Sequence, residues 1–274
     1  MVTITQEDLT PVLDSHSGGK VFAQVLDGIA SNDELLRALA RYIHFNSPFG
    51  GGVASLAGEI AVRVDLFRDP NEPLGITADR SVEVASKIFF AAIDDFADSA
   101  APHTETHRTL AQATLKRAGE FFGYDPAVLN SVARINRATF DAIIKVRNGY
   151  AVSRSVDEHS LFRALGFHMG SEMLAVEEFR LLDGFLRKKY SALADYLEKT
   201  KVKINSVQHV AYYWVRRHTT VEAEHFAAAV AGASAALQYY AGLESKRQIK
   251  EWILGGFAEF ASVQTEFMNG LLES

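Results

Sequence analysis

Apolar residues recur at three- and four-residue intervals through most of this chain. Between residues 77 and 99 the recurring positions are Val82, Ala85, Ile88, Phe89, Ala92, Ile93 and Phe96. This spacing is the period of an α-helix that turns one face to a protein core. Similar patterns predict helices over residues 125–149, 157–190, 205–240 and 245–272, and another after Pro102 that runs through Leu110, Leu115 and Phe122.

Signals for helix ends agree with this pattern. Ser31 and Glu34 have the spacing of a capping box, and Asp125-Pro126 is typical of an N-cap followed by the first helical residue. No stretch alternates convincingly between apolar and polar residues, so we predict no strands. The predicted fold class is all-α, with a single helical bundle domain over residues 1–274. Residues 1–76 would form N-terminal helices, and residues 77–274 the metal-binding core helices and a closing C-terminal helix.

Glycines mark positions where the predicted helices could kink or end. Residues 50–52 suit a turn or a tight packing point, and the long helix over 157–190 has glycines at 166, 170 and 184 where it could kink. Residues 149–150 offer a place where two helical halves could divide.

Composition narrows the class of protein. The 274 residues carry 28 Lys and Arg against 34 Asp and Glu, for a net charge of −6, and the basic residues are dispersed. Nucleic-acid binding is therefore not expected. Neither a signal peptide nor an apolar run of membrane-spanning length is present, which favours a cytoplasmic protein without membrane contact. The absence of cysteine excludes disulfides, thiolate metal sites and iron–sulfur clusters.

His218, Glu222 and His225 are the residues that most clearly indicate chemistry. Their i, i+4, i+7 spacing puts two imidazoles and one carboxylate on one face of a helix. Two nitrogen ligands and one oxygen ligand suit iron, manganese or zinc. Such residues are usually solvated, but these lie between apolar runs at 210–215 and 226–230. Metal ligation is favoured over a structural polar cluster, because buried polar groups need partners.

A second carboxylate ligand is expected from the helix over 157–190. Glu172 is a lone acid among apolar and small residues, where an ion pair between helices is the alternative to metal binding. His168 lies one turn earlier and is a candidate ligand or hydrogen-bonding partner. Glu177 and Glu178 are predicted to form a solvated face.

A third candidate region joins the end of one helix to the start of the next. It contains two types of ligand, carboxylates and imidazoles, at Asp94, Asp95, Asp98, His103 and His107. The histidines do not form a His-Glu-x-x-His zinc-protease motif, because the intervening Glu105 would point away from them.

Together these elements resemble the haem-oxygenase-like di-iron oxidases and oxygenases, a superfamily related in fold to thiaminase-type and PQQ-synthase-type proteins. In that superfamily one helix supplies a carboxylate followed by a histidine, a second supplies a Glu, and a third supplies a His-x-x-x-Asp/Glu-x-x-His element. The resemblance implies that the metal ligands here are Asp95, His107, Glu172, His218, Glu222 and His225. Two departures stand out: Asp95 replaces the usual Glu, and Glu222 replaces the usual Asp.

The resemblance also implies an activity. Two Fe(II) ions with O₂ as cosubstrate would oxidise a small amine, an amino-acid-derived molecule or a fatty acid, by N-oxygenation, desaturation or C–C cleavage, in specialised metabolism. An external electron donor and a homodimer are both compatible with this interpretation.

Two alternatives remain open. The trio on the third helix alone would suit a mononuclear metal hydrolase, and the same fold could serve as a helical binding module without turnover. A thiaminase-like hydrolase is disfavoured because the chain has no cysteine nucleophile. Haem oxygenation is disfavoured because no proximal histidine is clearly marked near the N-terminus, although His16 and His44 are available.

Overall fold

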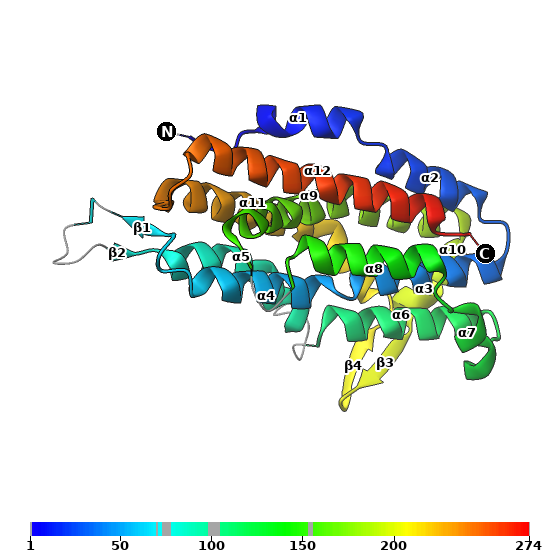
Figure 1. Cartoon of the computed structure of the whole chain (residues 1–274). Coiled ribbons are helices and arrows are strands. Elements are labelled where there is room, and N and C mark those ends of the chain that lie inside the picture. The colour runs from blue at the N-terminus through cyan, green and yellow to red at the C-terminus, as the bar shows by residue number, and fades with distance from the viewer. Residues whose placement is uncertain (1, 70, 73–77, 98–104, 153–155, 274) are drawn as a thin grey trace.

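The computed structural model describes residues 2–69, 71–72, 78–97, 105–152 and 156–273. Within these ranges the chain is all-α, with two short antiparallel hairpins beside the helices (Figure 1). The helices are α1 (Gln6–Ser15), α2 (Gly18–Gly28), α3 (Asn32–Asn46), α4 (Phe49–Ala61), α5 (Ser81–Phe96), α6 (His107–Phe121), α7 (Pro126–Val132), α8 (Arg137–Gly149), α9 (Glu158–Lys189), α10 (Ser191–Lys199), α11 (Tyr213–Tyr239) and α12 (Lys246–Gly270). The strands are β1 (Arg68–Asp69), β2 (Ala78–Asp79), β3 (Lys201–Ile204) and β4 (Val207–Val210).

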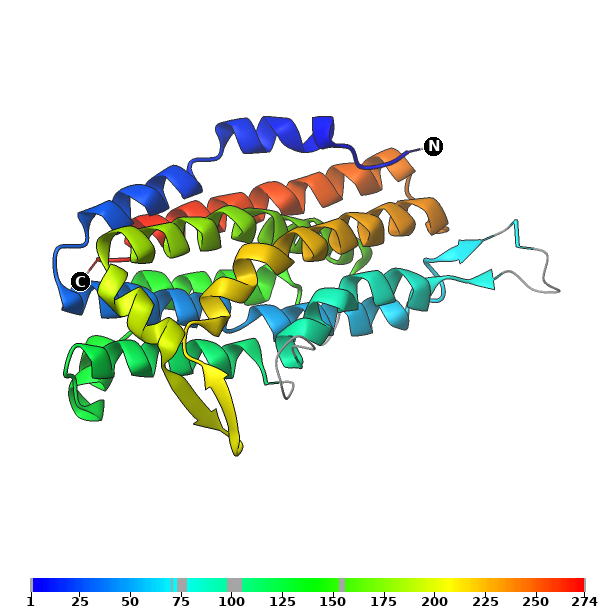
Figure 2. The same ribbon diagram turned by 180° about the vertical axis from the view of Figure 1, so that it is seen from behind.

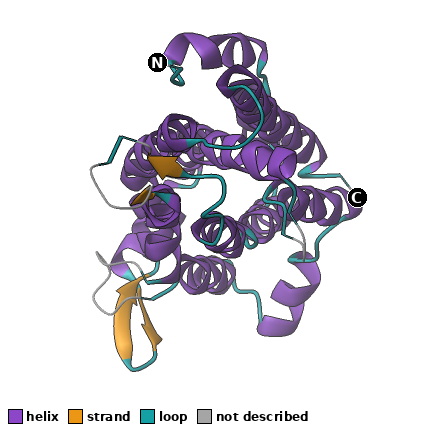
Figure 3. Cartoon of the chain, turned by 60° about the vertical axis from the view of Figure 1, so that its left-hand side comes forward, coloured by secondary structure: helices purple, strands orange, loops and turns teal. Residues whose placement is uncertain are grey.

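The long helix α9 is the centre of the bundle. It packs against α12 on one side and α11 on another, while α5 packs against both α4 and α11 (Figure 2). A single hydrophobic cluster reaches from Ile4 to Leu271 and includes residues on either side of residue 76. Figure 3 views many of the helices nearly end-on and shows the β3–β4 hairpin outside the helical bundle, whereas Figure 1 shows β1 and β2 projecting beyond one end of it. Among the described helices, none has the length and apolar character needed to cross a lipid bilayer.

The continuous course of α9 depends on its start signal and on close packing. The Asp157 side chain accepts a hydrogen bond from the Ser160 backbone N–H, which caps the helix. Further along, a Cβ on Gly166 would overlap the Ile253 carbonyl of α12, and a Cβ on Gly256 would overlap the Arg163 carbonyl of α9. The two helix backbones therefore touch where glycines remove the side chains, and α9 continues through this point as one helix.

Several predicted elements are confirmed with shifted ends. The capping box at Ser31 and Glu34 is formed, and Asp125 caps α7 by accepting from the Val128 N–H. The single helix predicted over 125–149 is wrong, because the chain breaks after α7 and restarts at α8, where Asn136 provides a new cap. Residues 50–52 lie inside α4 rather than in a turn, and Gly52 packs tightly against the Tyr150 ring.

The absence of strands was a wrong prediction. Residues 201–210, of which 205–210 were expected to begin a helix, form the β3–β4 hairpin, and α11 starts only at Tyr213. The turn residues Asn205 and Ser206 both have positive φ, 46° and 72°. Asparagine tolerates this conformation better than most residues, and two such residues in a row suit a two-residue hairpin turn.

Candidate metal centre

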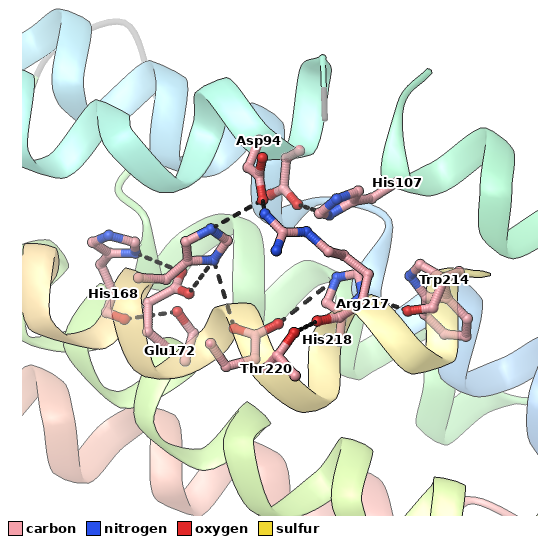
Figure 4. A network of polar contacts seen from close by, with 12 residues as sticks. Asp94, His107, His168, Glu172, Trp214, Arg217, His218 and Thr220 are labelled. Atoms are coloured by element: carbon pink, nitrogen blue, oxygen red, sulfur yellow. Dashed lines mark hydrogen bonds and ion pairs between the residues drawn. The ribbon is translucent and has the colours of Figure 1, made fainter. Parts of the chain in front are cut away.

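Four helices bring all six predicted metal ligands close together. Among the described residues, two groups of three have ligand atoms within 4.8 Å of one another. The first group combines the end of α5, the start of α6 and α11, and consists of Asp95, His107 and His218. The second combines α9 and α11, and consists of Glu172, Glu222 and His225. Part of this polar network is drawn in Figure 4.

The first group has two imidazoles and one carboxylate. Asp95 Oδ1 lies 3.0 Å from His107 Nδ1, and the His107 and His218 rings are 4.4 Å apart. His218 Nδ1 is 2.8 Å from the Trp214 carbonyl oxygen. Because a carbonyl only accepts, Nδ1 of His218 carries the hydrogen, which leaves the lone pair on Nε2. Holding one nitrogen in this way is how proteins orient histidine ligands.

The second group has two carboxylates around one imidazole. His225 Nδ1 lies 3.3 Å from Glu172 Oε2 and 3.7 Å from Glu222 Oε2. All three side chains are buried. Two ligands that share a metal at roughly 2.0–2.2 Å stand about 3 to 4 Å apart, so these spacings match the edge of a coordination shell.

Glu222 lies between the two groups. Its Oε1 is 3.7 Å from His218 Nε2 in the first group, and its Oε2 is 3.7 Å from His225 Nδ1 in the second. One carboxylate thus turns one oxygen towards each group, the arrangement of a bridging ligand.

The electrostatics of the second group favour a positive charge among its side chains. Burial by itself lowers the pKa of His225, but Asp94, Glu172 and Glu222 together raise it to about 12. Burial and the neighbouring Glu172 carboxylate raise the pKa of Glu222 to about 8. A buried cluster of carboxylates is costly unless a cation balances it, and either a proton or a metal ion fills that role.

Two further polar residues hold these ligands from outside. Asp94 Oδ2 lies 3.6 Å from His225 Nε2, on the far side of the ring from the carboxylates, and accepts a hydrogen bond of 2.9 Å from Arg217. His168 Nδ1 lies 3.2 Å from Glu172 Oε1 and belongs to neither group. Burial lowers the pKa of His168, which is fully enclosed. The same His168 nitrogen lies 3.4 Å from the Tyr150 hydroxyl, so His168 stands beside Glu172 as a neighbour of the predicted ligand and not as a member of either group.

The donor set fits divalent transition metals. Three imidazoles and three carboxylates form a mixed nitrogen and oxygen site, without thiolates, which suits iron or manganese as well as zinc. Although Asp95 has a short side chain, its Oδ1 still lies 3.0 Å from His107 Nδ1. Two other candidates from the sequence, Asp98 and His103, lie outside the described residues.

A cavity of about 310 Å³ adjoins the six residues and includes all of them in its wall. The remaining wall has an aromatic and aliphatic part, from Ile43, Phe45, Phe49, Phe96, Phe179, Trp214 and Phe260, and a polar part that includes Asn46, Thr106, Ser171, Glu178 and the cation Arg108. The Phe179 ring stacks on His218 with centroids 4.3 Å apart, so the apolar wall continues directly to the ligands. Trp214, at the start of α11, lines the cavity, whereas the Tyr212 hydroxyl donates a hydrogen bond to Asp183 on α9.

Glu178 was wrongly predicted to be solvated. Its exposed fraction is only 3%, and it lines the same cavity. The neighbouring Glu177 is exposed as expected. Two adjacent acids on a helix look alike in the sequence, and only the rotation of α9 decides which one faces inwards.

Comparison with known proteins adds no family to these observations. No protein-family model matches the chain, and no curated protein sequence matches it. The resemblance to haem-oxygenase-like di-iron proteins stays a prediction based on the residue pattern.

Proposed function

We propose that this protein is a non-haem di-iron enzyme that uses O₂ to oxidise a small molecule. The observation that carries the proposal is the pair of adjacent, largely buried ligand groups with Glu222 between them. A glutamate and a Glu-x-x-His pair on facing helices are a known way to hold two metals in a helical bundle. Glu172 on α9 and Glu222 with His225 on α11 supply these parts.

The number of ligands favours two metals over one. A mononuclear hydrolytic site would need only the three residues on α11, yet Asp95, His107 and Glu172 close in on them from three other helices. Three carboxylates near three imidazoles, two of these carboxylates fully buried and Asp95 partly so, also provide more negative charge than a single divalent ion needs. Both features support a two-metal centre.

Two iron ions held by these residues would supply the electrons and the oxygen chemistry. The chain would contribute orientation and a dry pocket. The Trp214 carbonyl fixes the His218 ring, and Asp94 and His168 hold His225 and Glu172 in place. The aromatic wall beside His218 keeps water away and packs against the apolar part of a substrate.

Several finer points stay predictions. The reaction would be N-oxygenation, desaturation or C–C cleavage of a small amine, amino-acid-derived molecule or fatty acid. Use of an external electron donor, a homodimeric state and a cytoplasmic location are proposals of the same kind.

The proposal is tested by loading the protein with Fe(II) under anaerobic conditions and then mixing it rapidly with O₂. We expect about two irons per chain and a transient visible absorption band. His107→Ala and Glu172→Ala each remove one ligand from a different group, so each should lower the iron content towards one and abolish the band. His159→Ala, at an exposed histidine, is the matched control. A chain that binds no iron, or that keeps full O₂ reactivity in both variants, would contradict the proposal.

A further inference from the structure

Glu178 is a buried carboxylate that the metal groups do not use. It lies on α9, its exposed fraction is 3%, and it lines the cavity that the six ligands also line. Its Oε2 accepts a hydrogen bond of 2.6 Å from the Tyr42 hydroxyl, and its Oε1 accepts from the Gln264 side-chain amide. These contacts fix the position of the carboxylate in the cavity wall.

The charge of Glu178 has no cationic partner among the described residues that bond to it. Tyr42 and Gln264 are both neutral, and the nearest charged influence is the like charge of Glu177. Burial accordingly raises the pKa of Glu178 to about 7. Burying a carboxylate without a counter-charge is costly. A bound molecule with a positive charge would offset this cost, which would account for a buried carboxylate in the wall of a cavity.

The residues around Glu178 and the cavity volume indicate the polarity and the size of that molecule. Tyr42 packs against Trp214 and Phe179, with ring centroids 6.1 and 5.6 Å apart, so the carboxylate stands among aromatic rings. Aromatic faces accommodate apolar groups and also attract cations. The volume of about 310 Å³ is at the lower end of ligand pockets, which limits the molecule to a small one.

We propose that Glu178 anchors the substrate and that it selects small primary amines with an apolar body. The ammonium group would take its place against the Glu178 carboxylate, and the hydrocarbon part would lie along the aromatic wall towards His218. This inference rests on the proposed function, since it takes the cavity as the substrate site of the di-iron centre. Within the predicted substrate range, it favours amines, because a carboxylate placed against Glu178 would be repelled. Arg108 also lines the cavity, so preferred binding of the carboxylate counterparts is the outcome that would contradict this assignment.

The test compares three amines with molecules of matched shape. n-Butylamine, n-hexylamine and 2-phenylethylamine are titrated by calorimetry at pH 7.5, each beside its alcohol and its carboxylate counterpart. Amines are protonated at this pH. We expect each amine to bind at least about tenfold more tightly than its alcohol, because a buried charge pair is stronger than a neutral hydrogen bond.

Three variants test whether Glu178 causes the preference for amines over alcohols. Glu178→Gln should reduce the preference for amine over alcohol to about one, whereas Glu177→Gln, the exposed neighbour with the same change in charge, should leave it intact. Tyr42→Phe keeps the carboxylate and should keep the preference. This variant and the wild-type amine-to-alcohol ratio still test the proposal if Glu178→Gln does not fold.

The titrations are run with metal-free protein and with protein incubated anaerobically with Fe(II). If Fe(II) does not bind but amines still depend on Glu178, the di-iron function fails and the amine site stands. If two irons bind and O₂ reacts, but amines bind no better than alcohols, or carboxylates bind best, the proposal for Glu178 is overturned.

Discussion

At the scale of single residues, three of the six predicted metal ligands each have a second residue beside them that orients the side chain. His218 donates to the Trp214 carbonyl, Glu172 is contacted by His168, and His225 is contacted by Asp94. Such outer partners set the tautomer and the orientation of ligands, and losing one commonly lowers metal affinity 10- to 100-fold. The Asp94 carboxylate also accepts a hydrogen bond from the Arg217 guanidinium, which holds the carboxylate in position.

Asp94→Asn should therefore weaken iron binding without removing a ligand. The amide keeps the size of the side chain but loses the charge that faces His225 Nε2. We expect about 10- to 100-fold weaker binding of one of the two Fe(II) ions in an anaerobic titration. Asp141→Asn, at a position on α8 that does not line the cavity, is the control and should bind iron like the wild type. Unchanged affinity in Asp94→Asn would show that Asp94 does not orient the ring.

Glu178 should make the stability of the metal-free protein depend on pH. Its pKa is raised by burial from 4.5 to about 7, so the folded protein binds its proton more tightly than the unfolded chain. The contribution of Glu178 to stability is thus complete below pH 4.5 and is lost as pH rises through 7. From pH 5 to pH 8 the loss is roughly 2–3 kcal/mol. Urea unfolding in EDTA should show this difference between wild type and Glu178→Gln, and a parallel pH dependence of the two proteins would refute it.

Residue types and spacing predicted much of the site but not its surroundings. The trio on α11 follows from helical periodicity alone, and Glu172 follows from being a lone acid in an apolar run. The sequence does not show which of Asp94 and Asp95 faces the site. Two adjacent acids on a helix differ only in the direction in which their side chains point, and this is set by the fold. Glu178 was missed for the same reason.

At the scale of secondary-structure elements, the position of α9 against α12 depends on glycine. The Gly166 and Gly256 backbones lie against the opposite helix, so α9 carries Glu172 and Glu178 at a depth set by this contact. Any larger residue there forces the two helices apart.

Gly166→Ala should consequently destabilise the protein by about 1–3 kcal/mol or more, the typical cost of overpacking. Gly184→Ala provides the matched control, because a Cβ at Gly184 of the same helix meets nothing within 4 Å. That control should be neutral or raise the free energy of unfolding by up to about 1 kcal/mol, since alanine favours helices. Chemical denaturation measures both variants. Equal stability in the two would mean that the α9–α12 contact is looser than described.

Periodicity predicted the existence of the long helices better than their ends or their inner faces. In α5 the apolar pattern includes Ala85, Ile88 and Ala92, which are buried, but also Phe89 and Phe96, which are exposed. The break between α7 and α8 and the β3–β4 hairpin were missed. The start of α8 depends on the cap residue Asn136, and the hairpin depends on the turn residue Asn205. Each is a single residue within a longer apolar pattern that by itself indicates one continuous helix.

At the scale of the whole molecule, the site exists only where four helices from distant parts of the chain meet. α5, α6, α9 and α11 carry the predicted ligands, while α3, α4 and α12 complete the cavity wall through residues such as Phe45, Phe49 and Phe260. Local sequence patterns identify the contribution of each helix, but the two-group arrangement with Glu222 between them is a property of the fold.

The central claim is that this arrangement holds two iron ions at once. Anomalous diffraction from crystals of Fe(II)-loaded protein, recorded on both sides of the iron absorption edge, tests it most directly. We predict two iron peaks about 3.5–4 Å apart, as in other two-metal sites. One peak should lie among Asp95, His107 and His218 and the other among Glu172, Glu222 and His225. A single peak, or iron only at other positions, would contradict the account.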